Sequence, residues 1–154
     1  MELGELDYPM FIVTAAARGE RAGCLVGFAT QCSIDPLRFI VCLSDKNRTF
    51  RVAREASLLV VHVVPEDAEW LAELFGSETG DDVDKFARCS WTPGPGGTPV
   101  IDDCGNWFAG RVLQRIPAGD HCAFLLEPLR EGDQAGERAF MFQDAQWIEP
   151  GHEA

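Results

Sequence analysis

Several features that mark other protein classes are missing from this 154-residue sequence. No stretch is long and apolar enough to span a bilayer, and residues 1–7 are acidic instead of basic and then apolar, as a signal peptide would be. Basic residues are scarce: 13 Lys and Arg stand against 25 Asp and Glu, which gives a net charge of −12. Such a surface repels nucleic-acid backbones and anionic lipids. We therefore expect a cytoplasmic protein that binds neither nucleic acid nor membrane.

The motifs of several enzyme and metal-site classes are also missing. The sequence has no Gly-x-Gly-x-x-Gly after a strand, no phosphate loop ending in Gly-Lys-Ser/Thr and no Gly-x-Ser-x-Gly elbow. Its six cysteines form no Cys-x-x-Cys pair, so we expect free thiols, several of them in the core. The three histidines are far apart and suggest no metal site. Of these, His62 is expected to be a core or sheet-face residue and His152 a solvated tail residue.

Short apolar runs separated by polar turns make up most of the chain. The predicted strands span residues 8–17, 22–34, 39–43, 58–64, 107–116, 121–129 and 139–142. Polar turns at 18–21 and 117–120 predict hairpins. Because the strands are mostly sequential, they favour an antiparallel barrel over a doubly wound sheet.

Two short helices are predicted between the strands. The first follows Asn47 and spans 48–56, and the second spans 66–75 and ends at Gly76. In the second helix Trp70, Leu71, Leu74 and Phe75 form one apolar stripe. Residues 81–87 could form one helical turn, and 93–97 should be irregular. We expect one domain over 1–154, with its core at about 8–149.

Five segments, in this order, resemble the flavin reductase-like proteins. They are 23–36, 39–49, Asp84-Lys85-Phe86, 93–100 and Gly119-Asp120-His121, and together they cover most of residues 8–130. The resemblance implies a split β-barrel that binds FMN, with FAD as an alternative, near the interface of a homodimer. The four Trp and ten Phe residues are compatible with such a buried interface.

The first segment is the candidate site for the flavin ring. A flavin needs a flat apolar slot and backbone donors for its polar edge. The candidate residues are Gly27, Phe28, Ala29, Thr30, Gln31 and Cys32. The alternative is an ordinary barrel strand with Gln31 exposed. The family's Thr-x-Ser-Ser is Leu25-Val26-Gly27-Phe28 here, so either the backbone with Thr30 and Gln31 replaces the missing hydroxyls or the flavin sits differently.

The second segment is the candidate site for the flavin phosphate. Free amides, a hydroxyl and two cationic side chains converge at Lys46, Asn47, Arg48 and Thr49, between a strand and a helix start. The alternative is a simple N-cap with solvated charges. In the family a Ser and a Thr contact the phosphate; Asn47 replaces the Ser and Thr49 keeps the Thr.

Three further residues complete the candidate site. Lys85 and Phe86 resemble the family's loop beside the flavin, and the alternative is a surface lysine beside a core phenylalanine. His121 matches a family histidine near the face where the nicotinamide docks, and the alternative is a turn histidine bonded to Asp120.

The resemblance therefore implies an NAD(P)H-dependent flavin oxidoreductase that delivers or uses reduced flavin, with a flavin-dependent monooxygenase as one candidate partner. Hydride transfer needs no catalytic acid or base, in keeping with a sequence that carries no such signature. Two other functions stay open. One is a flavin carrier or sensor with little reductase activity, and the other is a relative that uses deazaflavin or haem on the same barrel.

Overall fold

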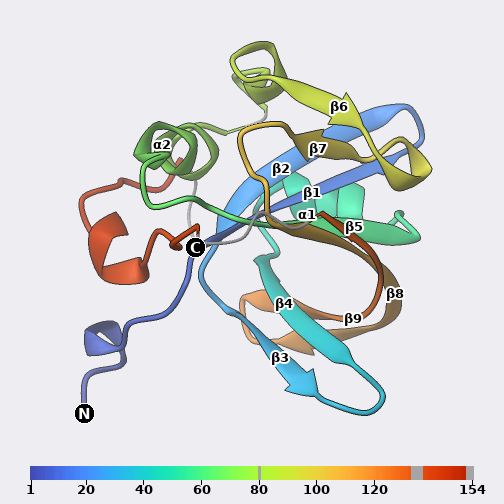
Figure 1. Ribbon diagram of the computed structural model, residues 1–154, viewed down its shortest axis with the longest axis horizontal. Helices are drawn as coiled ribbons and strands as arrows, with labels where there is room; N and C mark the ends of the chain where they lie inside the picture. The colour runs from blue at the N-terminus through green and yellow to red at the C-terminus, as the bar shows by residue number, and fades with distance from the viewer. Residues whose placement is uncertain (80, 133–136, 152–154) are drawn as a thin grey trace.

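The computed structural model describes residues 1–79, 81–132 and 137–151, so His152 lies outside the described residues. The strands are β1 (Phe11–Ala17), β2 (Glu20–Val26), β3 (Ala29–Ser33), β4 (Arg38–Ser44), β5 (Leu58–Val63), β6 (Trp91–Pro93), β7 (Pro99–Ile101), β8 (Trp107–Ala118) and β9 (His121–Gly132) (Figure 1). The helices are α1 (Arg48–Ala53) and α2 (Glu69–Ser77), with short 3-10 helices η1 (Leu3–Glu5), η2 (Lys85–Ala87), η3 (Pro95–Gly97) and η4 (Phe142–Ala145). None of the described helices is long and apolar enough to cross a membrane.

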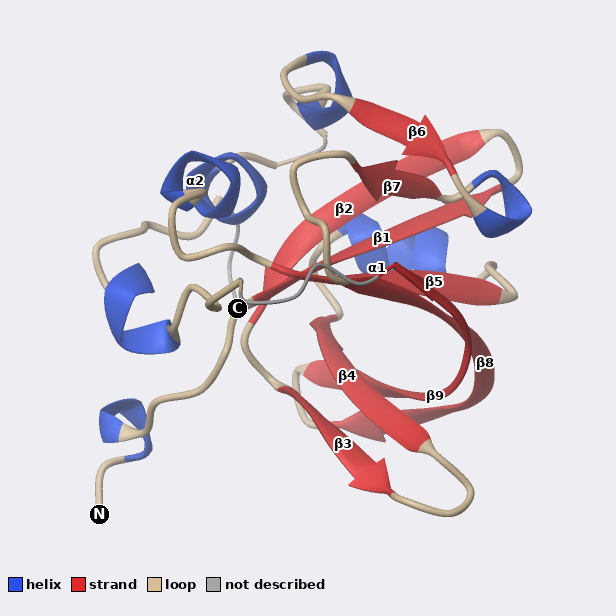
Figure 2. Cartoon of the chain, viewed as in Figure 1, coloured by secondary structure: helices blue, strands red, loops and turns tan. Residues whose placement is uncertain are grey.

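Seven of these strands form one sheet in the order β2-β1-β5-β8-β9-β4-β3, and every neighbouring pair is antiparallel. The strands β6 and β7 form a separate hairpin. Figure 2 shows the large sheet curling round, with β4 and β3 beneath β1 and β5, α1 close to β1 and β5, and α2 to one side of the sheet. The predicted fold, a mainly antiparallel split β-barrel with short helices, is confirmed.

The two longest strands, β8 and β9, make the curl of the sheet possible. Their pairing shifts register between Ala109 and Gly110 and again between Val112 and Gln114. Such bulges bend a strand and increase its twist. Gly110 lies at the first shift, and a Cβ there would lie 2.9 Å from the Cβ of Leu126. The backbone therefore approaches its neighbour more closely than a larger residue would allow.

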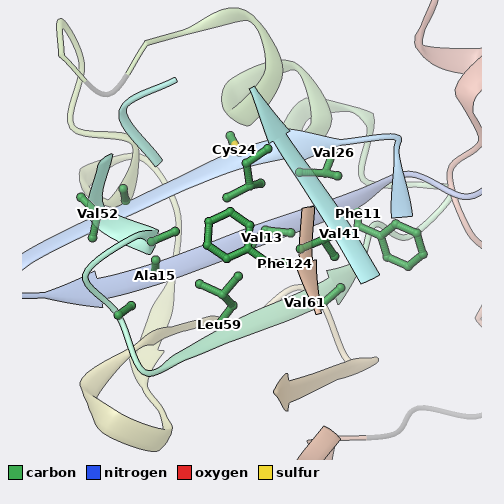
Figure 3. Close-up of a cluster of buried hydrophobic side chains, with 14 of the residues drawn as sticks. Phe11, Val13, Ala15, Cys24, Val26, Val41, Val52, Leu59, Val61 and Phe124 are labelled. Carbon is green, nitrogen blue, oxygen red and sulfur yellow. The ribbon is translucent and has the colours of Figure 1, made fainter. Parts of the chain in front are cut away.

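Apolar side chains cover both faces of strand β1, which pairs with β2 and β5. Val13 belongs to a cluster inside the curled sheet, where Leu59 and Phe124 point toward it (Figure 3). Ile12, on the opposite face, belongs to a second cluster with Leu71 of α2. Fully burying such a side chain contributes about 1.5–3 kcal/mol. Burial on both faces explains why this strand is apolar at successive positions.

The predicted strand 22–34 is wrong as one element, because it is interrupted at Gly27 and Phe28. There the Ala29 amide donates to the Gly27 carbonyl at 3.1 Å, which marks a tight turn. The two halves then pair with different strands, β2 with β1 and β3 with β4, at opposite edges of the sheet. This turn therefore connects the two edges of the barrel.

Three other predictions need correction. The helix predicted to end at Gly76 continues to Ser77; a Cβ on Gly76 would lie 2.8 Å from the Leu25 side chain, so close packing explains this glycine. Trp70 was predicted to be part of the apolar stripe of α2, but it is 47% exposed. The predicted strand 139–142 makes only isolated bridges, at Ala139 and Met141.

Residues 76–99 are more regular than the sequence indicates. The turn predicted within 81–87 is η2, and the stretch 93–97 contains η3 between the paired strands β6 and β7. About seven strands were predicted, and the described residues form nine. The two extra strands are three residues long and flanked by Pro and Gly, so they carry little apolar pattern.

The histidine and cysteine predictions agree with the structure in most respects. His62 is fully buried on β5: its Nδ1 lies 2.9 Å from the Ile12 carbonyl, and its Nε2 accepts from the Ile101 amide at 3.0 Å. All six cysteines are free thiols, and Cys24 and Cys104 are buried. Cys32 is exposed and thus not a core thiol. Within the described ranges no group of His, Cys, Asp or Glu could hold a metal ion.

Candidate functional site

Most of the predicted site residues lie in one of two separate regions of the surface. Gly27 to Gln31 line an apolar hollow, and Phe28 also contacts His121. We call the place where the turn at Gly27 and Phe28 meets His121 the seam of the barrel. Arg48, Thr49, Lys85 and Phe86 line a separate polar cleft. Cys32 lies on the exposed part of β3, in a shallow hollow with Ser33 to Asp35.

Phe28 is held at the turn between β2 and β3. Its carbonyl accepts from the Cys42 amide of β4 at 2.8 Å, which fixes the backbone. Its side chain is 56% exposed and its ring centroid lies 5.1 Å from that of His121, tilted by 55°. A large aromatic side chain exposed to this degree presents a flat apolar surface to a ligand.

His121 begins β9, opposite Ser44 at the end of β4. Its Nδ1 lies 2.7 Å from the Oδ1 of Asp120, whose carbonyl accepts from the Asp45 amide at 3.0 Å. The hydrogen bond with His121 lowers the pKa of Asp120, so this carboxylate stays ionised at neutral pH. An ionised carboxylate fixes the proton on Nδ1 and leaves Nε2 available to another partner. The predicted alternative for His121, a turn histidine bonded to Asp120, is thus observed, and this bond fixes the orientation of the imidazole ring.

The apolar hollow has a volume of about 570 Å³. One wall is formed by the turn at Gly27 and Phe28 together with the first residues of β3, up to Gln31. Another wall is the N-terminal segment with Leu3 and Leu6. That segment is attached by Gln143, whose side-chain amide donates to the carbonyls of Gly4 and Leu6 at 3.0 and 2.9 Å. The hollow can accept a flat, largely apolar ring.

The polar side chains of β3 are exposed beside this hollow. The Thr30 hydroxyl donates to the Gln31 carbonyl at 3.2 Å, and the Gln31 amide donates to the Ser33 carbonyl at 3.2 Å. Gln31 is therefore exposed, as its alternative interpretation predicts. Both bonds are local and solvent-accessible, so these groups can exchange them for bonds to a ligand.

The polar cleft has a volume of about 330 Å³ and lies between residues 19–23, α1 and residues 81–86. Arg48 extends across it and donates to the Arg21 carbonyl at 2.7 Å and to Glu20 at 3.3 Å. Its side chain is only 24% exposed, and these two bonds fix the position of the guanidinium. Of the predicted phosphate residues, Arg48 has the arrangement best suited to an anion.

Asn47 caps α1, as the simpler interpretation predicts. Its Oδ1 accepts from the Thr49 amide at 2.9 Å, and Thr49 itself is 1% exposed. Lys46 is half exposed, with its Nζ 3.6 Å from Asp45. The Thr49 amide is thus already bonded and the Thr49 side chain is buried, so neither is free to bind a phosphate at the start of α1.

Lys85 is a buried structural residue in this arrangement. It is 4% exposed, and its Nζ donates to the carbonyls of Gly23 and Phe75 at 3.0 and 3.1 Å. Burial lowers the pKa of its ammonium group. Phe86 is also buried and packs edge-on against Phe75 and Trp91. The alternative prediction for these two residues was a surface lysine beside a core phenylalanine. It is correct for Phe86, which is buried, and wrong for Lys85, which is also buried.

Sequence reasoning missed two ion pairs in and beside the cleft. Arg51 bonds Asp81 through one nitrogen at 2.6 and 2.7 Å, and Arg21 lies 3.6 Å from Asp84. The guanidinium of Arg21 also lies 4.9 Å from the centre of the Trp91 ring. The partners of each pair lie far apart in the sequence and belong to no motif. One available signal was that Arg51 follows Arg48 by one helical turn, which puts both on one face of α1.

A family model described as "Flavin reductase like domain" matches residues 3–144. The FMN reductase (NADH) RutF of Variovorax paradoxus is 26% identical over 147 residues, which cover 96% of this chain and 81% of that protein. A Rhizobium meliloti protein named "Probable flavin reductase" is 29% identical over 117 residues, or 73% of this chain. The chain spans only 37% of that relative's length.

The fold is also similar to solved structures. The NADH:FAD oxidoreductase of Streptomyces globisporus superposes with a TM-score of 0.83 at 21% identity, covering 90% of this chain and 83% of that one. At this identity the similarity establishes the shared fold.

Proposed function

Because the chain belongs to the flavin reductase like domain family, we propose that it is a flavin reductase that uses NADH or NADPH to reduce FMN. The observation that carries the proposal is the seam of the barrel, where the exposed Phe28 ring meets His121 beside an apolar hollow. The relative named FMN reductase (NADH), which aligns along almost the whole chain, supports the choice of flavin and nicotinamide. FAD is the alternative flavin.

The residues at the seam fit a flavin ring. The hollow is mainly apolar, and the strand segment Ala29 to Gln31 offers backbone and side-chain polar groups at its rim. Gly27 and Phe28 would cover one part of the ring, and the missing family hydroxyls would be replaced by this rim. Bound FMN would supply the hydride-accepting chemistry. The protein's part is to position the two rings and exclude water between them.

The charged end of the flavin requires a cation. We propose that Arg48 binds the phosphate, with Lys46 as a more exposed second cation, since a guanidinium forms strong charge-assisted bonds with phosphate oxygens. Asn47 and Thr49 would then support the Arg48 position instead of contacting the phosphate. Lys85 and Phe86 would hold the wall of the cleft.

We propose that His121 positions the nicotinamide. Asp120 orients the imidazole of His121 so that its Nε2 can bond the carboxamide of the nicotinamide. The Phe28 ring covers one side of the imidazole. For His121→Ala we expect a KM for NADH raised about tenfold with an unchanged Kd for FMN, since one charge-assisted or neutral hydrogen bond contributes about 1–2 kcal/mol. Steady-state kinetics and flavin titration measure the two. An unchanged KM and turnover would remove this role.

We further propose one domain over 1–154, a homodimer with the seam at its interface, and delivery of reduced flavin to an oxygenase of the flavin-dependent class. Each follows from the family resemblance, and the exposed apolar residues near the seam support the dimer.

The test of the function is the purified protein mixed with FMN and freed of excess by gel filtration. We expect perturbed flavin absorption bands and FMN-dependent oxidation of NADH or NADPH. Flavin binding without nucleotide oxidation would favour the carrier or sensor. Uptake of deazaflavin or haem in place of FMN would favour the other relatives, and either result would overturn the reductase proposal.

A further inference from the structure

Arg21 and Arg48 line the polar cleft, Arg51 lines the neighbouring hollow that shares Arg48 and Asp81 with it, and each of the three is paired with a carboxylate. Arg51 makes the tightest pair, 2.6 and 2.7 Å from the two oxygens of Asp81, and the Nε of Arg48 lies 3.9 Å from Asp81 Oδ1. On the other wall Arg21 lies 3.6 Å from Asp84. We call residues 81–84, Asp-Asp-Val-Asp, the acidic strap. It lies over the cations of the cleft and also forms part of its lining.

No spare cation balances this strap among the described lining residues. Lys85, the other basic residue of the cleft, uses its ammonium on two backbone carbonyls. Arg48 shares its charge between Asp81 and Glu20. A phosphate that enters the cleft must therefore take a guanidinium away from a carboxylate that already holds it.

We propose that Asp81 is a specificity-determining residue that lowers the affinity of the cleft for phosphorylated flavin relative to riboflavin. The inference rests on the proposed function, because it takes the flavin phosphate to be the anion that reaches Arg48. Asp81 acts in two ways: its ion pairs stabilise the empty cleft, and its carboxylate repels a phosphate dianion bound nearby. Both effects require the ligand's phosphate, and neither acts on riboflavin.

This arrangement suits a flavin that exchanges and does not remain bound. A cleft with unpaired guanidinium groups would hold FMN for longer, since most differences in affinity between related complexes arise from the rate of dissociation. With Asp81 present, its carboxylate replaces the departing phosphate on Arg48. FMN would therefore behave as a substrate that is bound, reduced and released.

The test compares Asp81→Asn with the parent protein in titrations with FMN and with riboflavin. We expect the variant to bind FMN about fivefold more tightly, since exposed ion pairs each contribute up to about 1 kcal/mol. Riboflavin affinity should stay the same, which also reports that the variant is folded. Asp82→Asn is the matched control. It removes the same charge one residue along, from a side chain that makes no ion pair within the described residues. Its effect on FMN should stay below about twofold.

Three results with the variants, and one with the parent protein, would overturn the inference. Weaker FMN binding by Asp81→Asn would mean that Asp81 prepares the arginines for phosphate, and equal tightening of FMN and riboflavin would mean a phosphate-independent effect. Equal effects of Asp81→Asn and Asp82→Asn on FMN affinity would mean that Asp81 acts only through its contribution to the net charge and not through its ion pairs. A parent protein that binds neither FMN nor riboflavin would overturn the proposed function and this inference together, so the two failures are distinguishable.

Discussion

At the scale of single residues, His62 shows how burial determines the charge of a side chain. Its Nε2 accepts the Ile101 amide, so the proton lies on Nδ1, which donates to the Ile12 carbonyl. Burial lowers the pKa of His62 to about 4, from 6.5 in the unfolded chain. The native protein therefore keeps this imidazole neutral, and it joins three strands by two hydrogen bonds.

We expect this histidine to make stability depend on pH. Since the folded pKa lies below the unfolded one, its contribution is fully present above pH 6.5 and is lost as the pH falls toward 4. The loss between pH 7 and pH 5 should be about 2 kcal/mol. Urea unfolding of the parent protein and of His62→Gln at both pH values measures it. The variant should be less stable at pH 7 but should have a smaller pH dependence. Equal dependence in both proteins would contradict the assignment.

Lys85 is the second residue whose environment determines its role. Its ammonium is the hydrogen-bond donor to two buried carbonyls on β2 and α2, so Lys85→Met would leave both without that partner. We expect a loss of about 3 kcal/mol in the free energy of unfolding. Lys46→Met is the control, since this lysine is half exposed, and it should change stability by less than about 0.5 kcal/mol. Chemical denaturation of the two variants measures the difference, and similar values would refute a structural Lys85.

At the scale of elements, the bend of β8 and β9 depends on small side chains where register shifts. For Gly110→Ala the new Cβ would lie 2.9 Å from the Cβ of Leu126, which is fully buried and cannot move aside. Overpacking of this kind costs about 1–3 kcal/mol. Gly4→Ala has open space around its Cβ and should be close to neutral. Thermal unfolding of both variants tests the close approach, and a stable Gly110→Ala protein would disprove it.

The elements that could be predicted from sequence are those with a local apolar pattern. The runs at β1, β4, β5, β8 and β9 were found because each carries several apolar residues within one short stretch bounded by polar turns. The break after Val26 was missed, since pairing of β2 with β1 and of β3 with β4 is a long-range property. In the site, His121 and Phe28 were both candidates and do lie together. The pair of Arg51 with Asp81 joins residues 30 positions apart and belongs to no motif.

At the scale of the whole molecule, exposed apolar residues gather on the β3–β4 side of the barrel. Ile34 is 85% exposed, Leu37 49% and Phe28 56%, and β3 is an edge strand of the sheet. An edge strand leaves backbone groups unpaired, and exposed apolar residues in the turns that flank it add to a surface that pairs readily with another chain. These residues support the proposed homodimer, in which the seam would be covered.

We therefore expect a dimer in sedimentation equilibrium, tightened by moderate salt because each chain carries a net charge of −12. Ile34→Glu should weaken the dimer at least about tenfold, because a charge in an apolar interface must be desolvated. Trp70→Glu, on α2 and away from the β3–β4 hairpin in Figure 1, is the matched control and should leave association unchanged. Equal effects of the two substitutions would argue against this interface.

The turn at Gly27 and Phe28 has a mechanical consequence for the barrel. Strands β2 and β3 follow one another in sequence but form the two outer edges of the seven-stranded sheet. A molecule bound at this turn contacts the only residues that connect β2 directly to β3, so it would hold the two edge strands of the sheet together. A ligand at this turn should slow the local opening of both edge strands together. Amide hydrogen exchange in β2 and β3 would then slow by similar factors, although the ligand contacts only the residues between the two strands.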